Sequence, residues 1–105
     1  MKSKSSTTTE SYRMAPVHPG RILRDELAER VLSANALARS LRVPSGRIVD
    51  ILNGKRAVTA ETALRLARFF GNDAQFWINL QGQYDLAVAR RRLGKRIEIE
   101  VEVAA

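Results

Sequence analysis

Residues 33–56 read SANALARSLRVPSGRIVDILNGKR and contain two short helical segments separated by a tight turn. Ser33 is a good N-cap for a helix over residues 34–41, because its hydroxyl oxygen can accept a hydrogen bond from an amide of the first turn. Pro44 ends this segment, since the residue before a proline is pushed out of the helical region. A second short helix is predicted over residues 45–52.

The rest of the chain predicts three further helices. Apolar residues recur every three or four positions there, as on the buried side of an amphipathic helix. Gly54, Gly71 and Gly94 are expected to end the third, fourth and fifth helices, because glycine readily adopts the left-handed conformation of a helix end. We therefore expect an all-α fold of five helices, with the other three over residues 19–30, 60–70 and 74 to about 92.

The two central helices predict a helix-turn-helix motif, in which the second helix lies in the major groove of DNA. Arg47 can bind a guanine through two hydrogen bonds or hold a phosphate, and Val49 can contact a thymine methyl group. A plain helical hairpin with a solvated face is the alternative. The candidate DNA-binding residues are Ser33 and Asn35 before and within the first helix, Ser45, Gly46, Arg47, Val49, Asp50 and Asn53 along the second, and Lys55 and Arg56 beyond it for backbone phosphates.

The amino-acid composition narrows the kinds of function that the protein can have. The 105 residues include 18 Lys and Arg against 11 Asp and Glu, and the resulting net charge of +7 suits a polyanionic partner such as nucleic acid. The chain has no Cys and a single His, so we expect no metal site, no cofactor and no catalysis based on His or Cys. No apolar run has the length of a membrane span, and we expect a cytoplasmic protein associated with the nucleoid.

The two ends differ from the predicted helical domain, residues 16–92. Residues 1–15 are rich in Ser and Thr and are expected to form a disordered leader. Residues 93–105 are expected to form a tail with a short β-strand, because Ile or Val alternates with Glu over residues 97–103. A lone strand would fray, pair with its copy in a dimer, or add to the sheet of a partner protein.

Several short motifs stand out along residues 16–86. They are Pro19-Gly20, Ile22-Leu23, Leu37-Ala38-Arg39, Val43-Pro44, Arg47-Ile48, Ile51-Leu52-Asn53-Gly54-Lys55-Arg56, Thr59 through Ala67, Gly71-Asn72, Phe76-Trp77, Asn79-Leu80-Gln81 and Tyr84-Asp85-Leu86. In these motifs the chain resembles the HigA group of Xre-type, phage-repressor-like proteins. The resemblance implies a lambda-repressor-like fold and an antitoxin function. It further implies that the protein binds a small HigB-like ribonuclease toxin and, as a homodimer, represses its own operon at a palindromic operator.

Three positions depart from the family pattern. Ala34 stands where the family often has Gln, and Gly46 stands where a polar side chain is more usual. Arg42 occupies the turn position where Gly is usual, at a cost on the order of 1 kcal/mol if the backbone is left-handed there. These departures affect the expected operator sequence more than the fold.

Four other features have both a structural and a functional interpretation. Phe76 is expected in the core, whereas Trp77 can serve either the core or an interface. His18 is expected to be exposed to solvent before the first helix. An acidic surface that could dock a basic toxin is expected on the first helix, at Asp25, Glu26 and Glu29.

Two other functions remain to be weighed against the antitoxin. A stand-alone Xre-type regulator without a toxin would have the same DNA-binding helices, and only the neighbouring gene would distinguish it. An enzyme such as a small basic ribonuclease is disfavoured by the single His, the lack of Cys and the helical pattern.

Overall fold

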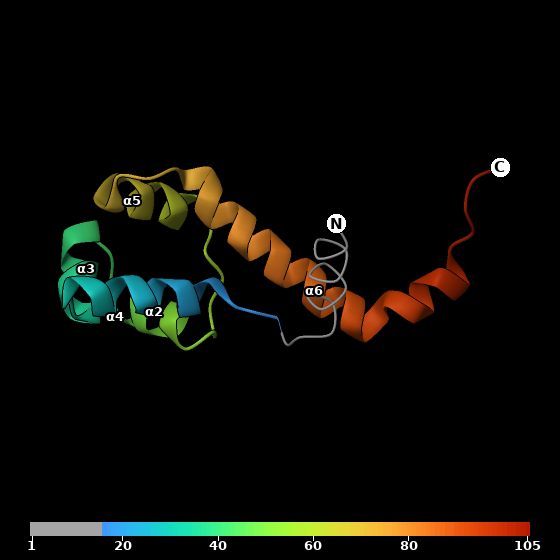
Figure 1. Cartoon of the computed structure of the whole chain (residues 1–105), viewed down its shortest axis with the longest axis horizontal. Helices are drawn as coiled ribbons and strands as arrows, with labels where there is room; N and C mark the ends of the chain where they lie inside the picture. The colour runs from blue at the N-terminus through green and yellow to red at the C-terminus, as the bar shows by residue number, and fades with distance from the viewer. Residues whose placement is uncertain (1–15) are drawn as a thin grey trace, which may run out of the picture.

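The computed structural model describes residues 16–105, which form five helices (Figure 1). The all-α prediction is confirmed, and the bounds of the first four helices match those predicted. The leader predicted for residues 1–15 lies outside the described residues. The helices are α2 (Pro19–Arg30), α3 (Ala34–Leu41), α4 (Ser45–Leu52), α5 (Ala60–Phe70) and α6 (Ala74–Glu100).

Caps explain where the short helices begin and end. The hydroxyl oxygens of Ser33 and Thr59 accept hydrogen bonds from the amides of Ala36 and Thr62, at 3.0 and 3.4 Å. These bonds satisfy amides that have no partner within the helix. Gly71 ends α5 with a left-handed φ of 73°, as the sequence predicted.

Within residues 16–105, two residues other than glycine also have left-handed backbones. Arg42, in the turn between α3 and α4, has a φ of 62°. The strain foreseen for a non-glycine residue at this turn is therefore present, on the order of 1–2 kcal/mol. Val31 at the end of α2 has a φ of 51°, which no sequence signal predicted, because a β-branched residue rarely adopts this conformation.

The core lies where α2, α3, α4 and α5 meet the first half of α6. Trp77 is fully buried in it, and its indole Nε1 donates a hydrogen bond to the Asn72 side-chain oxygen at 3.2 Å. Phe76 is 42% exposed, so the prediction that it lies in the core is wrong. Neighbouring positions on a helix point about 100° apart, and here it is the larger indole that faces inward. The other large side chains fully buried here include Leu23, Leu37, Ile48, Ile51 and Leu66.

The crossing of α2 over α4 leaves no room for a side chain at position 20. Gly20 is buried in the first turn of α2, directly after Pro19. A Cβ atom added to Gly20 would collide with the carbonyl oxygen of Ile51 in α4. Glycine is therefore needed at this position for close packing of two helix backbones.

The end of the chain differs from its prediction. Helix α6 continues through Gly94 to Glu100, so the β-strand expected over residues 97–103 is absent from the described structure. Extending an existing helix costs little, and one glycine in its interior costs only about 1 kcal/mol. The ion pair between Arg96 and Glu100, at 3.0 Å, supports this last turn.

The second half of α6 projects away from the other helices (Figure 1). Its exposed apolar side chains include Leu86, Leu93 and Ile97. Within residues 16–105, no helix is both long enough and apolar enough to cross a membrane.

His18 is half-buried rather than solvent-exposed, which corrects the sequence-based expectation. Its Nδ1 accepts a hydrogen bond from the amide of Gly20 at 2.9 Å, so the side chain caps α2. Its ring packs edge-on against Tyr84 of α6, with centroids 4.8 Å apart. Burial lowers the pKa of His18 below its ordinary 6.5, an effect partly offset by Asp85 and by a backbone hydrogen bond with Arg56.

A matched pair of glycine substitutions tests the crossing of α2 over α4. Gly20→Ala should lower the free energy of unfolding by about 3 kcal/mol, because backbone lies where the new methyl group must go. Gly46→Ala, at the same position in α4, should raise it by about 0.5–1 kcal/mol, because that site is open. Urea unfolding followed by circular dichroism measures both. Equal effects would contradict the close crossing.

The cap on α2 predicts a pH dependence of stability. The pKa of His18 is lower in the folded state, so the unfolded chain binds more protons below about pH 7. The contribution of His18 is therefore complete above its ordinary pKa of 6.5 and is lost as the pH falls from that value through the lower pKa of the folded state. His18→Asn keeps a capping side chain and does not titrate. As the pH is lowered from about 7.5 to about 5.5, the urea midpoint of unfolding should decrease more steeply for the wild type than for His18→Asn. Parallel curves for the two proteins would contradict the role of His18.

Candidate nucleic-acid interface

The turn between α3 and α4 holds the two helices in a tight corner. The amide of Val43 donates to the Ala38 carbonyl oxygen at 3.0 Å, which closes the C-terminal end of α3. On the inner side of α4, Ile48 and Ile51 are fully buried. The opposite side of α4 therefore faces outward. Of the predicted α4 residues, Ser45, Gly46, Val49 and Asn53 are exposed, and Arg47 and Asp50 are half-buried.

Arg47 and Asp50 take part in ion pairs with residues outside α4. Arg47 Nη1 lies 3.6 Å from Glu61 Oε1, at the start of α5. Asp50 Oδ2 lies 3.9 Å from Arg56 Nη2, in the loop after α4. The carboxylate of Asp50 therefore neutralises part of the charge of Arg56, and it remains available to accept a hydrogen bond from a base.

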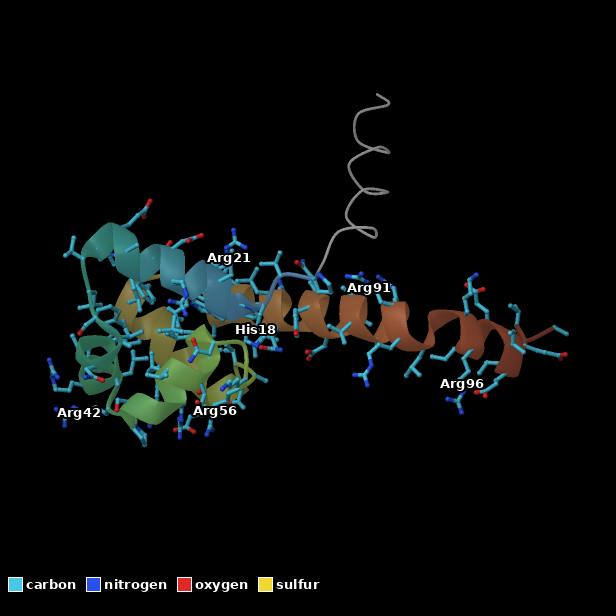
Figure 2. All side chains as sticks on the ribbon, turned by 90° about the horizontal axis from the view of Figure 1, so that it is seen from below. His18, Arg21, Arg42, Arg56, Arg91 and Arg96 are labelled. Atoms are coloured by element: carbon cyan, nitrogen blue, oxygen red, sulfur yellow. The ribbon has the colours of Figure 1, made fainter. Side chains whose placement is uncertain are left out.

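Cationic and amide groups flank α4 on both sides. Lys55 and Arg56 are exposed just beyond its end. Figure 2 places Arg56 and Arg42 at the same edge of the globular part as α4. Before α3, the Ser33 hydroxyl oxygen is engaged as the cap of Ala36, so the exposed Asn35 and the first amides of α3 are the groups left for a phosphate.

Two residues to which the sequence analysis gave no role in DNA binding brace this surface. Arg24 of α2 donates from Nη2 to the Leu52 carbonyl oxygen at 3.1 Å and to Asn53 Oδ1 at 3.2 Å. Gln81 of α6 is buried, and its Oε1 accepts a hydrogen bond from the Val58 amide at 2.8 Å. These bonds fix the end of α4 and the loop that carries Lys55 and Arg56. Both residues lie more than 20 positions away in sequence, so no local pattern could assign these roles.

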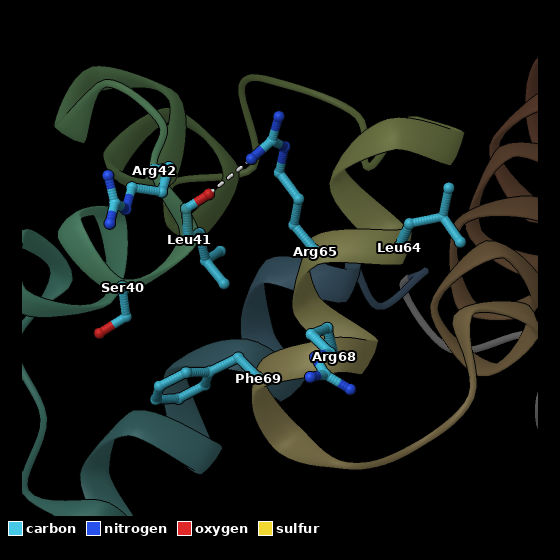
Figure 3. Close-up of a pocket in the computed structure, with 7 residues that line it drawn as sticks. All are labelled: Ser40, Leu41, Arg42, Leu64, Arg65, Arg68 and Phe69. Atoms are coloured by element: carbon cyan, nitrogen blue, oxygen red, sulfur yellow. Dashed lines mark hydrogen bonds between the residues drawn. The ribbon is translucent and has the colours of Figure 1, made fainter.

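A groove of about 400 Å³ lies between the end of α3 and α5, beside this surface. Arg42, Arg65 and Arg68 line it together with the apolar side chains of Leu64 and Phe69. Figure 3 shows Arg65 reaching across it to the Leu41 carbonyl oxygen, at 2.8 Å. None of the predicted DNA-binding residues lines this groove. Across residues 16–105, no three His, Asp or Glu side chains gather in a metal-binding arrangement.

Comparison with known proteins gives the same picture of the fold. The helix-turn-helix family model matches residues 23–77. An addiction module antidote protein of the HigA family from Coxiella burnetii is 51% identical, with a TM-score of 0.84 over 87% of this chain and 100% of that chain. Antitoxin HigA of Pseudomonas aeruginosa, solved with the higBA promoter, is 48% identical, with a TM-score of 0.83 over 86% and 99%.

A further relative has a similar percentage of residues identical to this chain. Virulence-associated protein I of Dichelobacter nodosus is 51% identical over 79 residues, which are 74% of this chain and 73% of the relative. The matched segments include the whole corner of α3 and α4 and the start of α6, where Trp77 is buried. The chain therefore belongs to the HigA family of helix-turn-helix antitoxins, a family of DNA-binding proteins and not of enzymes.

Proposed function

We propose that this protein is the antitoxin of a toxin–antitoxin module, which represses its own operon and neutralises a HigB-like ribonuclease toxin by direct binding. The observation that carries the proposal is the outward face of α4, lined with polar side chains and flanked by Lys55 and Arg56. A relative with about half its residues identical was solved with promoter DNA. DNA binding would place the protein in the cytoplasm, with the nucleoid.

In this proposal α4 lies in the major groove of the operator. Arg47 projects from its first turn and binds a guanine through two N–H groups. Val49 is 40% exposed and contacts the methyl group of a thymine. Asn53, held by Arg24 through its side-chain oxygen, presents its amide N–H groups to a base or phosphate. Ser45 and Asp50 add polar contacts, and Gly46 allows the backbone to approach closely.

Phosphate contacts on either side of α4 set its register on the duplex. Lys55 and Arg56 neutralise phosphates beyond the C-terminal end of α4. The amides at the start of α3, near Ser33 and Asn35, bind a phosphate on the other side of the groove. These contacts carry no sequence information by themselves, but they make binding dependent on salt concentration.

A second copy of the chain completes the DNA-binding unit. Leu86, Leu93 and Ile97 are exposed on the projecting half of α6, at spacings of seven and four residues. These spacings place the three side chains on one side of the helix. We assign this apolar stripe to the homodimer interface, because an unpartnered stripe of this kind is stabilised by burial against its copy. The dimer would place two copies of α4 in successive major grooves, about 34 Å apart.

The acidic surface of α2 supports docking of a basic toxin. Asp25 and Glu29 are exposed, and Glu26 is half-buried and paired with Arg30 at 3.4 Å. Opposite charge across an interface accelerates association and selects the partner. This surface belongs to α2 rather than α4, so its residues are separate from those proposed to contact DNA.

Alanine variants separate base reading from phosphate binding. Arg47→Ala should weaken operator binding by about 1–3 kcal/mol and relax the preference at one base pair. Lys55→Ala should weaken binding to all sequences and lower the salt slope by about one ion. A gel-shift series over salt concentration, with the promoter DNA upstream of its own gene, measures both. No shift of the wild type at low salt would end the DNA-binding proposal.

Co-expression tests the antitoxin function. The gene beside this one should encode a small basic protein, and expressing that protein alone should arrest growth. Co-expression of this protein should restore growth, and Asp25→Lys combined with Glu29→Lys should reduce the rescue while leaving the promoter gel shift intact. Growth arrest without rescue by the wild type would make the protein a stand-alone Xre-type regulator.

A further inference from the structure

We propose that Glu61 is a positioning residue for sequence reading, which holds the guanidinium of Arg47 in the orientation that binds a guanine. The inference rests on the proposed function, in which Arg47 reads a base. It adds a specificity determinant that lies on α5, outside the helix-turn-helix corner. The structural basis is a chain of polar contacts that links Arg47 to the end of α3.

The carboxylate of Glu61 bridges two arginines. Its Oε1 lies 3.6 Å from Nη1 of Arg47, and its Oε2 accepts a hydrogen bond from Nε of Arg65 at 3.1 Å. Arg65 is fixed in turn, because its Nη1 donates to the Leu41 carbonyl oxygen at 2.8 Å (Figure 3). Glu61 is thus held on one side by a residue that is itself anchored to α3, and it presents its other oxygen to Arg47.

The contact with Glu61 engages only one end of the Arg47 guanidinium. A guanidinium has five N–H groups in a rigid plane, and a guanine needs two of them for O6 and N7. With Nη1 directed at Glu61, the edge formed by Nε and Nη2 is the one left for the base. Arg47 is already restrained, because only 26% of its side chain is exposed. Holding a flexible side chain in its bound orientation reduces the entropy lost on binding.

Glu61 has a second effect of opposite sign. Its negative charge lies near the DNA-facing surface and repels phosphates, which weakens binding to every sequence. Removing the charge should therefore raise the affinity for unrelated DNA slightly, while it lowers the discrimination at the guanine that Arg47 reads. If Glu61 had a purely structural role, its substitution would change neither the affinity for unrelated DNA nor the discrimination at the guanine, or would lower both together.

The experiment uses the full chain and replaces operator guanines one at a time with 7-deazaguanine, which lacks the N7 acceptor. The guanine read by Arg47 is the one whose replacement weakens the wild type but not Arg47→Ala. At that guanine, the penalty measured by fluorescence anisotropy should shrink about two- to fivefold in Glu61→Gln, the range expected for an exposed ion pair. The penalties at the other guanines should not change.

Two further variants supply the controls. Glu29→Gln removes the same charge from the exposed surface of α2 and should leave the penalty unchanged. Adding Glu61→Gln to Arg47→Ala should have no further effect on discrimination, because Glu61 acts through Arg47. Thermal unfolding of each variant confirms that it is folded.

An unchanged penalty in a folded Glu61→Gln protein would overturn the inference, and so would the same change in Glu29→Gln. In either case the wild type would still bind its operator, and the proposed function would stand. Loss of operator binding by the wild type itself would instead contradict the proposed function.

Discussion

The architecture depends on the close approach of α2 to α4, where Gly20 lies against the carbonyl oxygen of Ile51. This backbone contact fixes the direction of α2 relative to α4. It also brings Arg24, one turn further along α2, to the C-terminal end of α4 and to Asn53. The same end of α2 carries His18, which caps the helix and packs on Tyr84 of α6. Because Gly20 has no side chain, α2 can lie directly against α4 in the core and place Arg24 at the surface proposed to read DNA.

Much of the fold could be predicted from the sequence because its signals are local. Ser33, Thr59 and Gly71 mark helix ends through bonds and backbone angles that span only a few residues. The end of α6 could not be predicted in this way. The alternation of Ile or Val with Glu over residues 97–103 fits a strand, but no second strand is present in the described part of the chain. Without such a partner, residues 97–100 instead continue the preceding helix through Gly94.

The residues of the candidate site could be predicted from the sequence, but the hydrogen bonds and ion pairs that hold them could not. Helical periodicity assigned the outward residues of α4, and the structure places all of them at least partly at the surface. It could not reveal that Glu61 and Arg65 of α5 link Arg47 to the end of α3, or that Gln81 holds the loop after α4. Such bonds join residues that are distant in sequence, and they follow from packing rather than pattern. The half-buried position of Arg47 agrees with its contact with Glu61.

The central claim is that the outward face of α4 enters the groove of operator DNA. The chain has no Cys, so a single Val49→Cys substitution provides a unique thiol on that face, and Glu29→Cys provides a matched thiol on α2. The rate of alkylation of each thiol, measured by mass spectrometry with and without promoter DNA, tests the claim directly. The account predicts that bound DNA slows the reaction at position 49 strongly and leaves that at position 29 unchanged. Equal rates at position 49 with the promoter bound would contradict it.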